Sequence, residues 1–131
     1  MKKEIISVAC KTPSVNSLYL TFVRGGIIIR VKTDIAKKLG KEVERQLFVL
    51  NTSKFDKFKD KKLFVTLGVH GNWYNKDGSV KKKDLANYEK FITDTVFDYI
   101  GLKDQFIFDY YLTKVQDDIE GFVLQIELVE K

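Results

Sequence analysis

Apolar residues occur along the chain in short runs that are separated by polar, turn-forming segments, and this pattern predicts β-strands. The runs cover residues 3–9, 18–32, 63–73, 106–115 and 121–130. The second run is interrupted by Gly25-Gly26, a pair typical of the tight turn in a β-hairpin. It therefore predicts two strands, and each of the other runs predicts one.

Two segments have a helical pattern instead. In residues 34–48 the apolar positions Ile35, Leu39, Val43 and Leu47 recur every four residues, behind the N-cap candidates Thr33 and Asp34. The second segment, residues 84–100, is amphipathic and is followed by Gly101, a residue typical of a helix C-terminus.

The order of these elements predicts the fold class. Strands, a helix, a strand, a second helix and further strands indicate an α/β domain of the α+β type, with a mixed sheet on which two main helices pack. With 131 residues and no segment that reads as a linker, the chain is predicted to be a single domain, 1–131.

Charge and composition narrow the function classes. The formal net charge of +5 favours an anionic partner, with nucleic acid ahead of a membrane. No apolar run reaches the roughly 20 residues of a membrane span. A single cysteine and a single histidine make a disulfide, a zinc site and Ser-His chemistry poor hypotheses. A cytoplasmic protein is expected.

The polar side of the second helix is the first candidate site. Asp84, Asn87, Lys90 and Asp94 fall on one side of it at helical spacing, where Phe91 is the only apolar residue, and lysines 81–83 come directly before it. One interpretation is an N-cap at Asp84 with a surface ion pair between Lys90 and Asp94. The other is a site that holds a divalent metal against a phosphate, which would explain lysines ahead of a helix N-terminus, where cations are disfavoured.

Three segments taken together resemble the RusA-like Holliday junction resolvases. They are "TPSVNSLY" at 12–19, "KKKDLANYEKFITDTV" at 81–96 and "GLKDQFIFDYYLTK" at 101–114. The resemblance implies a RusA-like fold and a Mg²⁺-dependent, structure-selective endonuclease that resolves four-way DNA junctions in recombination and repair. Such an enzyme acts as a homodimer on branched DNA in the cytoplasm of a bacterium or a phage-infected host cell.

The resemblance also implies roles for single residues. Asp84, Asp94 and Asp104 match catalytic and metal-binding acids of the family, and Lys90 matches its catalytic lysine. Asp104 follows Lys103, where the family usually has a first aspartate. The DNA-binding positions are Lys81, Lys82, Lys83, Asn87, Lys114 and Asn16.

One position departs from the family pattern. The helix motif is Asp-x-Asp-Asn, and its second acid is Ala86 in this chain. Alanine binds no metal, so the chain lacks a ligand that the family normally uses. The site could have degenerated naturally, Asp94 or a water could compensate for the missing acid, or the alanine could be an engineered substitution. An alternative function follows, that of a junction- or branched-DNA-binding protein with impaired catalysis.

Aromatic residues near the basic segments allow two interpretations each. Trp73 and Tyr74 could stack on unpaired bases or pack in the core. The lysines of 54–62, interleaved with Phe55 and Phe58, could form a DNA-facing patch or a solvated loop. His70 is interpreted as structural or exposed.

Overall fold

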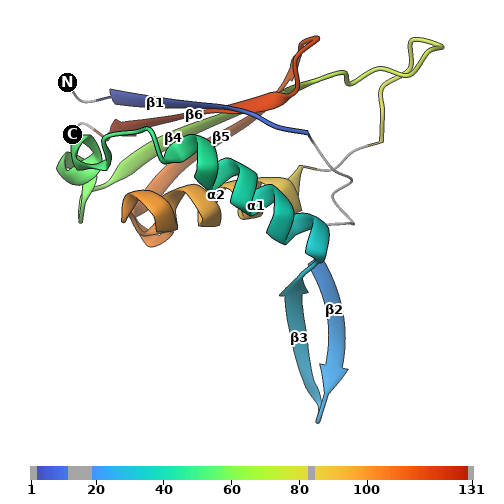
Figure 1. Cartoon of the computed structure of the whole chain (residues 1–131), viewed down its shortest axis with the longest axis horizontal. Coiled ribbons are helices and arrows are strands. Elements are labelled where there is room, and N and C mark those ends of the chain that lie inside the picture. Colours follow the sequence, from blue (N-terminus) through green and yellow to red (C-terminus); the bar gives the residue numbers. More distant parts are fainter. Residues whose placement is uncertain (1–2, 12–18, 83–84, 130–131) are drawn as a thin grey trace.

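Four strands form a mixed sheet, two α-helices cover one of its faces, and a two-stranded ribbon extends away from this body (Figure 1). The structure is a computed structural model, and it describes residues 3–11, 19–82 and 85–129. The elements are β1 (Lys3–Ala9), β2 (Tyr19–Arg24), β3 (Ile27–Lys32), α1 (Asp34–Leu47), the 3₁₀ helix η2 (Thr52–Phe58), β4 (Leu63–Gly71), α2 (Ala86–Ile100), the 3₁₀ helix η3 (Asp104–Phe106), β5 (Ile107–Gln116) and β6 (Gly121–Leu128).

The main sheet has the strand order β1-β6-β4-β5. Strand β4 pairs parallel to β5 and antiparallel to β6, and β6 pairs antiparallel to β1. Along β4, Leu63, Val65, Leu67 and Val69 are buried while the residues between them are partly exposed. This alternation is that of a sheet with one covered face. The predicted α+β fold with a mixed sheet is confirmed.

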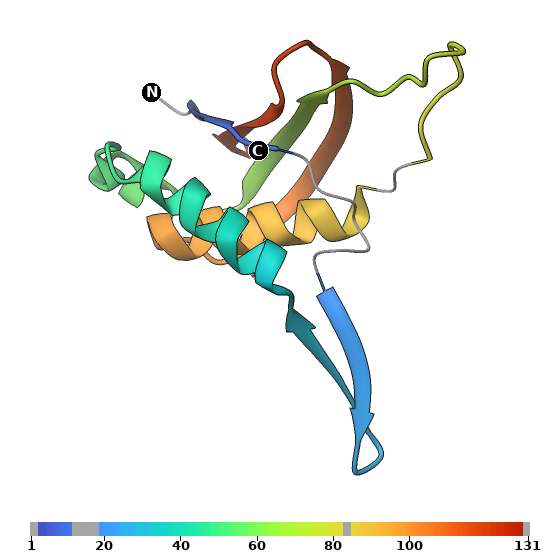
Figure 2. The same cartoon turned by 45° about the vertical axis from the view of Figure 1, so that its right-hand side comes forward.

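Helix α1 lies across α2 on the covered face of the sheet (Figures 1 and 2). It begins where predicted, because the Thr33 side chain accepts a hydrogen bond of 3.2 Å from the Ala36 amide. Val43 and Leu47 are buried as the periodicity predicted, but Ile35 is 53% exposed. The first turn of α1 lies next to the ribbon, and there Ala36 and not Ile35 is the residue that enters the core.

Helix α2 packs against α1 and is buried on more sides than the sequence predicted. It begins at Ala86, its N-cap position is Leu85, and the Leu85 side chain makes no capping hydrogen bond. Residue 84, where the helix was predicted to begin, lies outside the described residues. Phe91, which was assigned to the polar side, is fully buried against Gly40 of α1. Gly101 ends the helix in a left-handed conformation, as predicted. Neither α-helix in the described part of the chain is long and apolar enough to cross a membrane.

The ribbon of β2 and β3 is the predicted hairpin. Gly25 and Gly26 both have positive φ angles, of 58° and 78°, which the tight turn requires. Most of its residues are exposed, including Val23 and Ile28 next to the turn. The ribbon extends from the start of α1 as an arm (Figure 2).

The phenylalanines of residues 54–62 belong to the core and do not form a DNA-facing patch. Phe55 and Phe58 lie on η2 and are fully buried. Lys54 and Lys57 lie over their rings and pair with Glu4 of β1, at 3.5 Å and 2.5 Å. The two phenylalanines are three residues apart, the spacing of a 3₁₀ helix, and lysines surround them in the sequence. The sequence pattern therefore did not indicate that their rings are buried.

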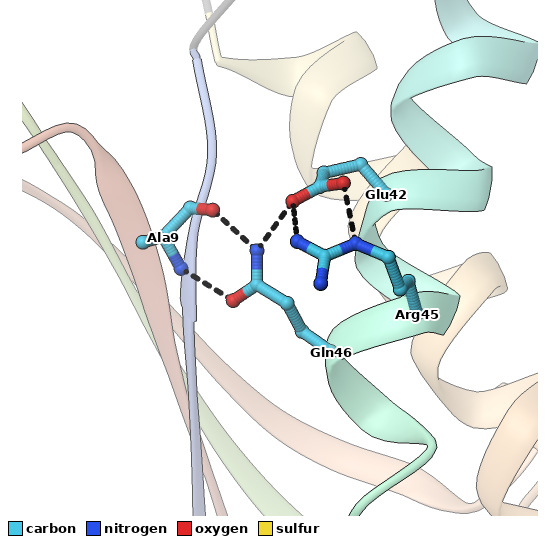
Figure 3. Close-up of polar contacts among 4 residues, drawn as sticks. All are labelled: Ala9, Glu42, Arg45 and Gln46. Carbon is cyan, nitrogen blue, oxygen red and sulfur yellow. Dashed lines mark hydrogen bonds and ion pairs between the residues drawn. The ribbon is translucent and has the colours of Figure 1, made fainter.

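Helix α1 is also tied to the open edge of the sheet. Figure 3 shows the Gln46 side chain bridging to the backbone of Ala9. Its Oε1 accepts a hydrogen bond of 3.0 Å from the Ala9 amide, and its Nε2 donates one of 2.6 Å to the Ala9 carbonyl. Glu42 holds Gln46 in place by accepting a hydrogen bond of 3.0 Å, and Arg45 donates to the same carboxylate. The amide thus satisfies edge groups that another strand could otherwise pair with.

Candidate active site

A cavity of about 400 Å³ lies where the exposed stripe of α2 faces η3 and the start of β5. Its lining combines three acids, one lysine, two hydroxyl groups and one apolar side chain, namely Glu89, Asp94, Asp104, Lys90, Thr93, Tyr110 and Ile107. The fold therefore brings together Asp94 and Asp104, which the resemblance implied as parts of one site although they lie on different elements. Lys90, the implied catalytic lysine, lines the same cavity.

Lys90 and Asp94 form the ion pair that their spacing predicted. The Nζ atom of Lys90 donates a hydrogen bond of 3.1 Å to Oδ2 of Asp94. This contact raises the pKa of Lys90, so the ammonium group keeps its charge at the mouth of the cavity. Asp94 thus serves at least to position Lys90.

A hydroxyl network joins α2 to β5 at the floor of the cavity. Thr93 donates a hydrogen bond of 3.2 Å to Oε2 of Glu89, and the Tyr110 hydroxyl lies 2.8 Å from the Thr93 oxygen. Burial raises the pKa of Tyr110, so this hydroxyl stays protonated near neutral pH. The network fixes the Glu89 carboxylate inside the cavity.

The carboxylate of Glu89 is held in an unfavourable electrostatic environment. Burial is the largest cause of its raised pKa, and the negative charges of Asp94 and Asp104 raise it further. The Thr93 hydrogen bond and the charge of Lys90 oppose this shift. The cavity therefore destabilises added negative charge and would gain from a bound cation.

Replacing Glu89 with glutamine should stabilise the free protein at pH 7. A carboxyl whose pKa is raised on folding binds its proton more tightly in the folded state, so its ionisation reduces stability as pH rises above the usual 4.5. Because the group is partly solvated, we expect Glu89→Gln to raise Tm by only about 1–2 °C at pH 7. The gain should vanish at pH 4, where both states are largely protonated.

Differential scanning fluorimetry at the two pH values measures this effect. Glu44→Gln, at an exposed position of α1 that does not line the cavity, removes the same charge and is the control. A Glu89→Gln protein that melts lower than the unsubstituted chain at pH 7 would mean that the carboxylate stabilises the fold.

Several predicted residues lie away from the cavity or outside the described residues. Lys114 is exposed farther along β5, with Nζ 5.1 Å from the centroid of the Trp73 ring. Lys81 and Lys82 follow the turn after Trp73, and the Lys81 amide donates a hydrogen bond of 2.8 Å to the Trp73 carbonyl. Asp84, Lys83 and Asn16 lie outside the described residues, as does the side chain of Asn87, whose backbone belongs to α2.

Trp73 and His70 have structural contacts, whereas Tyr74 is exposed. Trp73 is buried and donates from Nε1 to the carbonyls of Val69 and Val115, so packing explains it better than base stacking. Tyr74 is 48% exposed. His70 lies 3.0 Å from Asp117 through Nδ1 and takes no part in the cavity.

The oxygen-rich lining has the donor chemistry that Mg²⁺ prefers. However, within residues 3–11, 19–82 and 85–129 no three acidic, histidine or cysteine side chains are grouped so that they could hold one metal ion. The Asp94 carboxylate is engaged by Lys90, and Asp84 lies outside this part of the chain. The described residues thus offer oxygen donors of the kind that Mg²⁺ binds, but they do not form a complete metal site by themselves.

Sequence reasoning missed Glu89, Thr93 and Tyr110. The available signal was the Glu-x-x-x-Thr spacing, which places Glu89 and Thr93 on one side of α2 one turn apart. Nothing local in the sequence indicated that Tyr110 of β5 would complete the network, because that contact depends on how α2 crosses the sheet.

The chain was also compared with known proteins. No protein-family model matches it, and no curated protein matches it significantly, so the resemblance to the RusA-like resolvases rests on the motif residues alone.

Proposed function

We propose that this protein is a Mg²⁺-dependent, structure-selective endonuclease that resolves four-way DNA junctions. The observation that carries the proposal is the shared cavity of Asp94, Asp104 and Lys90. These residues come from two elements and match three motif positions of the RusA-like family. A surface ion pair alone would explain Lys90 and Asp94, but it gives no reason for Asp104 to face them.

The charge of the cavity supports a metal-dependent reaction on a phosphate. Three carboxylates and one lysine leave an excess of negative charge, which by itself repels a phosphodiester. The chain as a whole carries +5 and attracts DNA. A divalent cation between the acids and the phosphate would allow a negatively charged cavity to accept a phosphodiester. Because the rest of the binding is electrostatic, we expect junction affinity to fall steeply with salt.

Each candidate site residue has a defined role in this proposal. Asp84, Asp94 and Asp104 would hold Mg²⁺, which when bound supplies a Lewis acid and an activated water. Lys90, kept charged and aimed by Asp94, would stabilise negative charge that develops on the phosphate oxygens. Lysines 81–83, Asn87, Lys114 and Asn16 would contact the DNA, and a cytoplasmic location follows from that substrate.

Cleavage of a labelled four-way junction, with Mg²⁺ and with EDTA, tests the proposal. We expect symmetric nicks only with Mg²⁺, and much less cleavage of a linear duplex of the same sequence. If neither binding nor cleavage of the junction exceeds that of the duplex, the proposed function is wrong.

A second candidate function has one observation in its favour. Ala86 replaces an acid of the family motif, and the described residues include no group of three metal-binding side chains. A protein that binds branched DNA without cutting it would fit both facts. Junction binding that is tight and selective, with no nicking in Mg²⁺, would favour this alternative.

The proposal includes a homodimer, because a four-way junction has two-fold symmetry and two strands to cut. Its structural support is the edge strand β5, where Phe108 and Tyr111 are 61% and 63% exposed. Light scattering at tens of micromolar should give twice the 15.2 kDa mass of one chain. A monomer mass under these conditions would contradict this part of the proposal.

A further inference from the structure

The two faces of the β2–β3 ribbon differ in chemistry. Residues that pair directly across an antiparallel ribbon share a face, so the register assigns each pair. One face is largely apolar, with Leu20 opposite Val31 and Phe22 opposite Ile29. The other face is basic toward its base, where Tyr19 pairs with Lys32 and Thr21 pairs with Arg30.

The base of the basic face lies beside α2. The Arg30 guanidinium carbon is 5.2 Å from the centroid of the Tyr19 ring, and Lys32 Nζ is 5.6 Å from the centroid of the Phe91 ring. After burial, the Asp94 carboxylate is the largest cause of the raised pKa of Tyr19, while Lys90 and Arg30 oppose it. Tyr19 is therefore within electrostatic reach of Asp94 and Lys90, and Arg30 lies against the Tyr19 ring.

The Tyr19 hydroxyl is an unusual group at this place. Its oxygen is buried, and it has no hydrogen-bond partner among the residues that the structure describes. A buried hydroxyl without a partner reduces stability, and such groups are rare in folded proteins. A ligand that offers a hydrogen-bond acceptor beside Lys90 and Arg30 would satisfy it, and a phosphate oxygen is such an acceptor.

We propose that Tyr19 and Arg30 bind a backbone phosphate of the nucleic acid that enters the cavity of Asp94 and Asp104. Tyr19 donates its hydroxyl to a phosphate oxygen, and its ring holds Arg30 against the same phosphate. The ribbon thereby extends the site from α2 onto a separate element. This inference rests on the proposed function, because it takes DNA as the ligand of the cavity.

Tyr19→Phe is the sharpest test, since it removes only the oxygen atom. The free protein should keep its Tm or melt slightly higher, because a buried unpaired group is lost. Affinity for a four-way junction, measured by fluorescence anisotropy in EDTA, should fall by about three- to tenfold for one lost hydrogen bond to a charged oxygen. A side chain with a purely structural role would not separate the two readouts in this way.

Arg30→Ala tests the charge, with Arg45→Ala as the matched control. Both substitutions remove one positive charge, but Arg45 pairs with Glu42 on α1 whereas Arg30 lies against the Tyr19 ring. We expect Arg30→Ala to weaken junction binding about tenfold and to lower the slope of log K against log salt by about one. Arg45→Ala should stay within about twofold of the unsubstituted chain.

Three outcomes would overturn the inference. Tyr19→Phe could lower Tm and leave affinity unchanged, which would make the hydroxyl a structural group. Arg30→Ala and Arg45→Ala could weaken binding equally, which would indicate general charge attraction. Arg30→Ala could convert a dimer to a monomer in light scattering, which would assign the ribbon to a second copy of the chain. If the unsubstituted chain binds no junction, the proposed function itself fails, and that result precedes any variant.

Discussion

Replacing Asp104 with asparagine should nearly abolish Mg²⁺-dependent junction cleavage while leaving junction binding intact. Asp104 is exposed on η3 and lines the cavity opposite the α2 residues. Asparagine keeps its size but loses the negative charge that a magnesium ligand supplies. Even outer partners of metal sites reduce activity by 10–100-fold when changed, so loss of a direct ligand should lower the rate by about 100-fold or more.

Single-turnover cleavage of a labelled junction measures this loss, and anisotropy in EDTA measures binding. Binding should not weaken, because the substitution removes a charge that repels phosphate. Asp109→Asn is the matched control, since Asp109 is an exposed acid of the adjoining β5 that does not line the cavity. If Asp104→Asn cuts as fast as Asp109→Asn, Asp104 is not a metal ligand, and the site that the family resemblance implies is wrong.

The sequence predicted the fold well because its patterns are strong and local. The apolar run of β4, the Gly25-Gly26 turn and the Thr33 cap are each such a pattern, and the structure has all three. The errors occurred where burial depends on distant packing. Ile35 fits the helical repeat yet is exposed, and Phe91 lies on the nominally polar side yet is buried under α1.

The candidate site was predictable only in part, for a related reason. Helical spacing indicated Lys90 and Asp94, and the family resemblance implied Asp104; all three line one cavity. It could not identify Tyr110 or Tyr19, because neither lies in a local pattern of polar residues. Their places depend on how β5 and the ribbon approach α2, which no short-range periodicity specifies.

Ala86 is the position where the chain departs from the resolvase motif, and the structure gives it a location. It is the first residue of α2, exposed to solvent, one turn before Lys90. Thr93 comes seven positions after Ala86, so the side chains at 86 and 93 point in directions around the helix axis that differ by only about 20°. A side chain at 86 would therefore extend from the same side of α2 as Glu89, Lys90 and Thr93, above the cavity.

Restoring an acid there should raise the rate of junction cleavage. In Ala86→Asp, a carboxylate at the first turn would be stabilised by the helix dipole and could pair with Lys90 at i,i+4. It would also return the metal-binding oxygens that the motif of the family provides. We expect cleavage in Mg²⁺ to increase by about 10–100-fold, the range that partners of a metal site usually contribute. Binding in EDTA should stay equal or weaken slightly, because the new charge repels phosphate.

Ala86→Asn separates the charge from the size of the new side chain and serves as the control. It should cut little faster than the unsubstituted chain, because a neutral amide adds no charge to a magnesium site. The Mg²⁺ concentration for half-maximal cleavage should fall in Ala86→Asp alone, since a further carboxylate tightens metal binding. A chain that already cuts junctions rapidly and gains nothing from Ala86→Asp would show that Asp94 or water has replaced the missing ligand. The deficiency at residue 86 would then be only apparent, and the endonuclease proposal would stand without it.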